Sequence, residues 1–171
     1  MIKIVFTGPE CSGKTTLSVE ISKEFRAPLV KEYARDYLEN IKREYNYNDL
    51  VQIAKGQLKS EQDYAKKTNQ LLICDTNLQV IKIWSKIKYA KCDSFILNNL
   101  DSEAYYVLCY PDFPWEYDPL RENEHDRIKL AKYYHQDLIE NNYKFIIARG
   151  NHRKRISFVK SAINKMISRS F

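Results

Sequence analysis

The stretch GPECSGKT, residues 8–15, decides the fold of this chain, and it holds two of the four glycines among 171 residues. It satisfies the pattern G-x-x-x-x-G-K-[ST] and lies between an apolar run at 2–6 and a segment of helical period that starts at 14. The glycines let the backbone curl so that N–H groups point at phosphate oxygens, and the following helix adds the positive end of its dipole. Lys14 can reach terminal phosphates, and the Thr15 hydroxyl can ligate Mg²⁺. We therefore expect a nucleotide-binding loop formed by Gly8, Pro9, Glu10, Cys11, Ser12, Gly13, Lys14, Thr15 and Thr16.

Composition places the chain among ordinary globular proteins, with 44% hydrophobic and 29% charged residues. Its length predicts a single domain, 1–171. The four cysteines show neither zinc-site spacing nor a disulfide framework, which is typical of a reducing compartment. No apolar run reaches the roughly 18 residues of a membrane span, and the first run leads straight into the glycine loop. We expect a cytoplasmic protein with no membrane partner.

The net charge of +6 is concentrated at the C-terminal end. Residues 141–171 hold eight basic side chains and no acidic one, so residues 1–140 carry 20 basic and 22 acidic side chains, a net of −2. Such a segment is either a solvated helix face, a patch near bound phosphates or a nucleic-acid surface. We favour the first two, so a nucleic-acid partner is not expected.

Short apolar runs alternate with segments of helical period along the whole chain. The runs are 2–6, 28–30, 71–74, 104–109 and 143–148, and the helical segments are 14–25, 33–43, 49–67 with Asp49 as N-cap, 78–89, 126–140 and 153–168. Five strands separated by helices predict an α/β fold of P-loop type, with a parallel sheet covered by helices on both faces. Ligands bind at the carboxyl ends of such strands. We therefore expect the functional residues within 8–15, 32–35, 75–76, 111–127 and 149–155.

The third apolar run, LLIC, is followed directly by Asp75. An aspartate at a strand end can cap the next helix, but a parallel sheet brings this strand end close to the glycine loop. Asp75 is then the expected acid that holds Mg²⁺ through water beside the bound phosphates.

Several sequence motifs of other P-loop protein classes are missing, which reduces the number of classes to which the chain could belong. The chain has no N-K-x-D to read guanine, no x-x-G after Asp75, no L-S-G-G-Q, and no second acid after Asp75 to polarise a hydrolytic water. A small-molecule kinase with ATP and Mg²⁺ as cofactors is the class that remains.

A kinase of this size needs an acceptor pocket and a lid that excludes water. In KEYARDY, Glu32 can bind a hydroxyl or take its proton and Arg35 can bind an anion, although the two could simply form a surface salt bridge. The proline-rich segment 111–127 is the predicted lid. Its Arg121 and Arg127 can neutralise charge on the transferring phosphate, unless they are ordinary loop arginines. Trp115 either stacks on an aromatic ring or anchors the lid.

Five motifs in order resemble the ribosylnicotinamide kinase domain of the bacterial bifunctional NAD-biosynthesis regulator: G-P-E-x-S-G-K-[ST], E-Y-A-R-x-Y, A-x-G-Q at 54–57, C-D-T at 74–76 and P-W-x-x-D-P-L-R at 114–121. The resemblance covers about residues 3–165. It implies ATP-dependent phosphorylation of the ribose 5′-hydroxyl of nicotinamide riboside. It also implies that Glu32, Tyr33 and Arg35 bind the acceptor and that Asp118, Arg121 and Arg127 belong to the lid. By fold-level analogy, the loop ARGNHRKR, residues 148–155, with Arg153 is expected near the adenine.

The chain departs from the family pattern at two positions. Asn77 replaces the second carboxylate of D-T-D, and Lys31 stands where the bifunctional proteins can have a tryptophan that stacks on the pyridine ring. Either Asp75 or Glu32 could be the base. The alternatives are another nucleoside or nucleotide kinase of this fold, and a nucleotide-dependent regulatory or nucleic-acid-binding ATPase. The sequence does not indicate the oligomeric state.

Overall fold

A computed structural model describes residues 1–168 of the chain, and Arg169, the last of the basic C-terminal residues, lies outside the described part. Within it, five strands form one parallel sheet in the order β2-β3-β1-β4-β5. Their bounds are β1 Ile2–Thr7, β2 Leu29–Val30, β3 Leu71–Asp75, β4 Tyr105–Cys109 and β5 Lys144–Ala148. This confirms the predicted parallel α/β fold, and each strand coincides with a predicted apolar run to within one residue.

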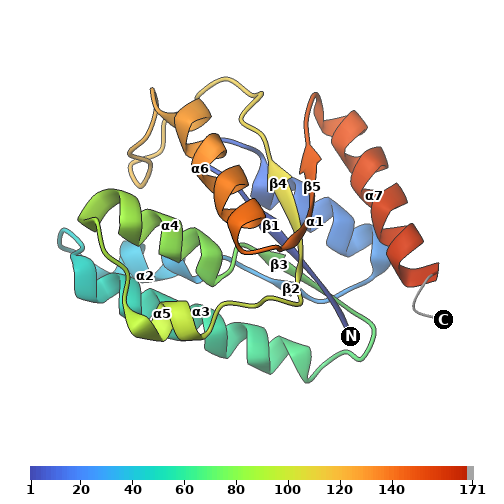
Figure 1. Cartoon of the computed structure of the whole chain (residues 1–171), viewed down its shortest axis with the longest axis horizontal. Helices are drawn as coiled ribbons and strands as arrows, with labels where there is room; N and C mark the ends of the chain where they lie inside the picture. The colour runs from blue at the N-terminus through green and yellow to red at the C-terminus, as the bar shows by residue number, and fades with distance from the viewer. Residues whose placement is uncertain (169–171) are drawn as a thin grey trace.

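Helices cover both faces of the sheet (Figure 1). On one face, α1 (Lys14–Phe25) and α7 (His152–Ser168) pack on alternate strand residues such as Ile4 and Phe6. On the other face, α4 (Leu78–Tyr89) and α6 (Arg127–Glu140) pack on the intervening residues such as Val5. Side chains that point alternately to opposite faces explain why the strand sequences are apolar throughout.

A third apolar cluster lies beside the sheet, where α2 (Tyr33–Ile41), α3 (Tyr47–Ala65), α4 and the short α5 (Ser94–Asn98) pack together. Sequence analysis did not predict α5, because five residues are too few to show a helical period. The predicted N-cap of α3 is wrong. Asn46 is the N-cap, accepting a bond from the Asn48 amide, while Asp49 occupies the third helical position and accepts from the Asn46 amide at 2.8 Å, which completes a capping box.

The register of the sheet brings the carboxyl ends of β1 and β3 together. Phe6 pairs with Asp75, and the Thr76 amide donates to the Phe6 carbonyl at 3.1 Å. The loop from β4 to α6 rises at this same edge, above the N-terminal end of α6 (Figure 1). The sheet therefore positions the glycine loop, Asp75 and the predicted lid at one edge. None of the helices within residues 1–168 has the length and apolar character needed to cross a membrane.

Candidate active site

The glycine loop joins β1 to α1, and its backbone requires glycine at both glycine positions of the motif. Gly8 has φ +131°, and a Cβ there would lie 2.5 Å from the Cys109 carbonyl oxygen. Gly13 has φ +78° and occupies the N-cap of α1 without a side-chain capping bond. The first-turn N–H groups of α1 and the positive end of its dipole therefore face the loop, which is the environment that binds phosphate.

The Lys14 side chain crosses the loop. Its Nζ donates to the Gly8 carbonyl at 2.9 Å and to the Pro9 carbonyl at 2.8 Å. These bonds hold the ammonium group over the concave side of the loop. A phosphate held by the loop amides would therefore meet a positive charge already in place.

Asp75 ends β3 and is almost fully buried, with 3% of its surface exposed. Burial raises its pKa, while the neighbouring Thr15 hydroxyl and the Lys14 ammonium act in the opposite direction. Its Oδ1 atom is buried and has no hydrogen-bond partner within residues 1–168. An unpartnered buried carboxylate oxygen beside a hydroxyl fits Mg²⁺, which takes few protein ligands and completes its shell with water and phosphate oxygens.

Glu32 stands at the N-terminal end of α2, half-buried at the wall of the cleft. Removal from water raises the pKa of its carboxyl group, and the Lys14 charge opposes this shift. The carboxylate makes no capping bond to its own helix. A cleft-facing carboxylate that is poorly solvated and lies near a lysine is suited to accept a proton from a bound hydroxyl.

The loop opens into a cleft of about 700 Å³. One part is lined by the glycine loop, Glu32 and Arg35. The other part lies between α2, α4 and α6 and is mainly apolar, lined by Leu38, Val80, Ile83, Trp84, Ile87, Leu130 and Tyr134. A site with phosphate-binding groups at one end and an aromatic, apolar wall at the other can hold two different molecules side by side.

The segment 111–127 crosses the mouth of this cleft and contacts the glycine loop at several points. The Glu10 carboxylate accepts from the Glu122 amide at 3.1 Å and from the Asn123 amide at 2.9 Å. Arg121 donates to the Cys11 Sγ atom at 2.9 Å. Arg127 donates to the Phe113 carbonyl at 2.8 Å, and its Nε is buried with no partner in the described part of the chain.

The same segment also contacts the helices on the acceptor side of the cleft. Asp118 pairs with Arg35 of α2 at 2.9 Å. Glu122 pairs with Lys88 of α4 at 2.8 Å and accepts from the Tyr45 hydroxyl at 2.9 Å. Arg35 is thus paired with Asp118 rather than with Glu32, and the salt bridge considered for Glu32 and Arg35 does not form.

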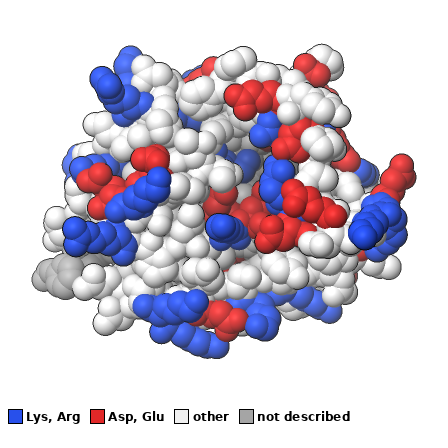
Figure 2. Space-filling model, turned by 180° about the vertical axis from the view of Figure 1, so that it is seen from behind, with Lys and Arg blue, Asp and Glu red and all other residues white. Residues whose placement is uncertain are grey.

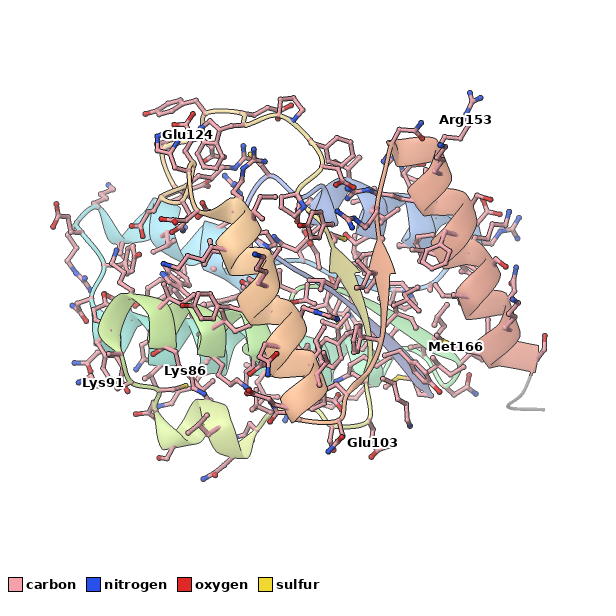
Figure 3. The ribbon with its side chains drawn as sticks, turned by 45° about the horizontal axis from the view of Figure 1, so that its top comes forward. Lys86, Lys91, Glu103, Glu124, Arg153 and Met166 are labelled. Carbon is pink, nitrogen blue, oxygen red and sulfur yellow. The ribbon has the colours of Figure 1, made fainter. Side chains whose placement is uncertain are left out.

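Six residues assigned to the site from sequence do not line the cleft: Tyr33, Asp75, Trp115, Asp118, Arg127 and Arg153. Tyr33 packs its ring against Gly56, and Trp115 lies against Arg127, whose guanidinium is 5.6 Å from its ring centroid. Arg153 is exposed and projects outward from the N-terminal end of α7 (Figure 3). His152, which sequence analysis did not assign, lines the cleft instead.

Sequence reasoning also missed Arg155, the arginine of this segment that supports the glycine loop. It is 1% exposed and donates to the Ser12 carbonyl at 2.6 Å, the Gly150 carbonyl at 2.8 Å and the Tyr110 carbonyl at 2.7 Å. It also pairs with Asp112 at 3.2 Å. The signal was present, because Arg155 precedes the buried Val159 and Ile163 by four and eight residues and so shares their helix face.

Several of the other basic C-terminal side chains are paired with acids. Lys160 pairs with Glu24, Lys144 with Glu103 at 3.6 Å, and Arg149 with Asp112 at 3.9 Å. On the face turned away from the view of Figure 1, basic and acidic side chains lie beside one another (Figure 2). These pairings reduce the charge available to a polyanion and favour the solvated-face interpretation of the C-terminal helix.

The fold and the glycine loop define the class as P-loop proteins with a kinase-like α/β domain. The family described as "AAA domain" matches residues 3–155, and the chain belongs to this family. It is 26% identical over 151 residues to the Escherichia coli (strain K12) protein described as "Trifunctional NAD biosynthesis/regulator protein NadR". That match covers 84% of this chain and 37% of the relative, so the chain spans well under half of the relative's length.

Solved structures share the fold. A NadR protein in complex with NR superimposes with a TM-score of 0.79 at 18% identity, over 98% of this chain and 52% of the other. A NadR protein in complex with NAD and AMP-PNP gives a TM-score of 0.76 at 17% identity, over 97% and 49%. Deoxyadenosine kinase from M. mycoides, with dATP bound, gives 0.69 at 19% identity, over 95% and 100%. These likenesses establish the P-loop kinase-like fold.

Proposed function

We propose that the protein is an ATP-dependent nucleoside kinase, and that its acceptor is nicotinamide riboside, which it phosphorylates on the ribose 5′-hydroxyl. The observation that carries the proposal is the continuity of one cleft from the glycine loop to the apolar wall between α2, α4 and α6. Transfer between two bound molecules requires this arrangement, because the donor phosphate and the acceptor hydroxyl must be held within reach of each other.

The donor end supports ATP. The loop amides and the N-terminus of α1 would hold the β- and γ-phosphates, and Lys14 would follow the γ-phosphate as it moves. Thr15 and Asp75 would hold Mg²⁺, which neutralises phosphate charge when it is bound. Arg121 lines the cleft from segment 111–127, which we propose to be the lid that excludes water, and Arg127 holds this segment through the Phe113 carbonyl.

The acceptor end supports a nucleoside. Trp84 and Tyr134 offer aromatic surface to a heteroaromatic base, and Glu32 and Glu116 supply negative charge suited to a cationic pyridinium ring. We assign Glu32 as the carboxylate that orients the 5′-hydroxyl and accepts its proton, since it lines the cleft whereas Asp75 is buried beside Thr15. The match to NadR and the NadR structure in complex with NR support this choice of acceptor.

Thermal unfolding in the presence of Mg²⁺ and AMP-PNP tests the proposal with a panel of nucleosides. Nicotinamide riboside at about 100 times its Kd should add about 2.7 kcal/mol to the stability of the AMP-PNP complex, seen as a further rise in Tm. A rise with a purine or pyrimidine nucleoside and none with nicotinamide riboside would make the protein a kinase of different specificity. No rise with any nucleoside, together with DNA binding that falls steeply with salt, would overturn the kinase proposal.

A further inference from the structure

The motif A-x-G-Q, residues 54–57, lies in α3, one element away from the groups already assigned to the chemistry. Gln57 is 1% exposed, and its side-chain amide contacts the start of α2 and the turn after β3. Its Oε1 accepts from the Tyr33 amide at 2.9 Å, and its Nε2 donates to the Thr76 carbonyl at 3.4 Å and to the Glu61 Oε1 at 3.5 Å. Tyr33 follows Glu32, and Thr76 follows Asp75.

The contact to Tyr33 replaces a missing helix cap. The first N–H groups of an α-helix have no partner within the helix and need an acceptor from outside it. Glu32 is the N-cap residue of α2 but makes no side-chain capping bond. Gln57 thus supplies, from the neighbouring helix, the acceptor for the first amide of α2, while the Glu32 carboxylate lines the cleft.

The contact to Thr76 holds an unusual turn. Thr76 has φ +74°, a left-handed conformation that is unfavourable for a β-branched residue. The turn is fixed on one side by the Thr76 amide, which donates to the Phe6 carbonyl at 3.1 Å, and on the other by Gln57. This turn sets the direction in which the chain leaves Asp75.

A primary amide suits both contacts. One end of the Gln57 side chain meets an N–H donor and must accept, while the other meets carbonyl and carboxylate oxygens and must donate. The preceding residue, Gly56, leaves room for the Tyr33 ring, since a Cβ on Gly56 would lie 2.1 Å from that ring. The Gly56–Gln57 pair therefore holds both the ring and the amide of Tyr33.

We propose that Gln57 is a positioning residue that fixes the Glu32 and Asp75 carboxylates relative to each other, by capping α2 and pinning the turn after β3. The proposal deepens the kinase assignment and rests on it for its kinetic consequence. Its structural consequence, the capping of α2 by a side chain of α3, stands independently of the substrate.

The test compares Gln57→Met, which keeps the length of the side chain and removes both bonds, with Gln52→Met, an exposed position on the same helix. Gln57→Met should lower kcat by about 10- to 100-fold, the usual cost of a small misplacement of reacting groups. The Kd for AMP-PNP without Mg²⁺ should change less than about twofold, since Gln57 does not touch the glycine loop. Gln52→Met should leave both values unchanged.

Amide hydrogen exchange gives a readout that needs no activity. In the wild-type protein the Tyr33 amide should be protected like a bonded helix amide. In Gln57→Met its exchange should rise by about five- to tenfold relative to amides in the middle of α2.

The outcomes are distinguishable. An unprotected Tyr33 amide in the wild-type protein would overturn the proposal even if no variant folds. A lower Tm for Gln57→Met with an unchanged kcat per folded molecule would also overturn it, since that pattern indicates packing alone. A wild-type protein that binds AMP-PNP and phosphorylates no nucleoside, with Tyr33 protected through Gln57, would refute the kinase assignment and leave the capping contact standing.

Discussion

Arg155 is the clearest case in which one buried side chain supports the glycine loop. Its guanidinium reaches the Ser12 carbonyl in the loop, the Tyr110 carbonyl at the end of β4, the Gly150 carbonyl after β5 and the Asp112 carboxylate. Replacing it by methionine would leave three carbonyls and one carboxylate without their donor. A hydrogen bond from a charged donor is worth about 1.5–3 kcal/mol, so losing the three bonds to carbonyls should cost about 3–5 kcal/mol. That loss is a large part of the roughly 5–15 kcal/mol that stabilises a domain.

The assay is urea unfolding of Arg155→Met beside Arg153→Met. Arg153 precedes it by two residues and is exposed, so its replacement should change the free energy of unfolding by less than about 0.5 kcal/mol. Arg155→Lys should fall between the two, because an ammonium on a linear chain cannot reach all four acceptors. A loss below about 1 kcal/mol for Arg155→Met would refute the reasoning, since the buried bonds would then be replaceable by water.

Three further predictions concern the cleft and the motif beside it. Lys14→Ala should lose far more single-turnover activity than Glu32→Gln, because positioning and charge dominate phosphoryl transfer; comparable losses would contradict this order. Asp75→Asn should abolish Mg²⁺-dependent turnover and stabilise the protein by about 0.5–2 kcal/mol at pH 7 in denaturant unfolding. Because the pKa of Asp75 is raised in the folded protein, ionisation of this carboxyl group destabilises the fold as the pH rises. The stabilisation by Asp75→Asn should therefore shrink in acid. A stabilisation that does not change with pH would contradict this reasoning. Gly56→Ala should lower Tm, because its methyl group would overlap the Tyr33 ring, and an unchanged Tm would show that the ring moves freely.

The elements that could be predicted from sequence are those whose signal is local. The glycine loop is recognisable because its backbone conformation requires glycine at fixed positions. The apolar runs mark the strands because both faces of the sheet are buried. The Asp75 position followed from the parallel arrangement alone, since neighbouring strand ends meet at one edge.

The elements that could not be predicted depend on partners distant in sequence. The contacts of segment 111–127 with Glu10, Arg35 and Lys88 are set by tertiary packing, which no local pattern encodes. Whether Arg153 or Arg155 points toward the glycine loop depends on which face of α7 packs on the sheet. The four-residue spacing from Arg155 to the buried Val159 indicated that face. The cap of α3 was misplaced because Asn46 and Asp49 are both good cap residues, and the reciprocal bonds of the capping box involve both.

The most direct test of the central claim is the stoichiometry of a single reaction. The purified chain is incubated with ATP, Mg²⁺ and nicotinamide riboside, and ADP, inorganic phosphate and nicotinamide mononucleotide are quantified from the same sample. The proposed kinase should form ADP and the mononucleotide in equal amounts, with little free phosphate, because the lid keeps water from the transferring group. ADP formed with an equal amount of inorganic phosphate and no mononucleotide would contradict the claim.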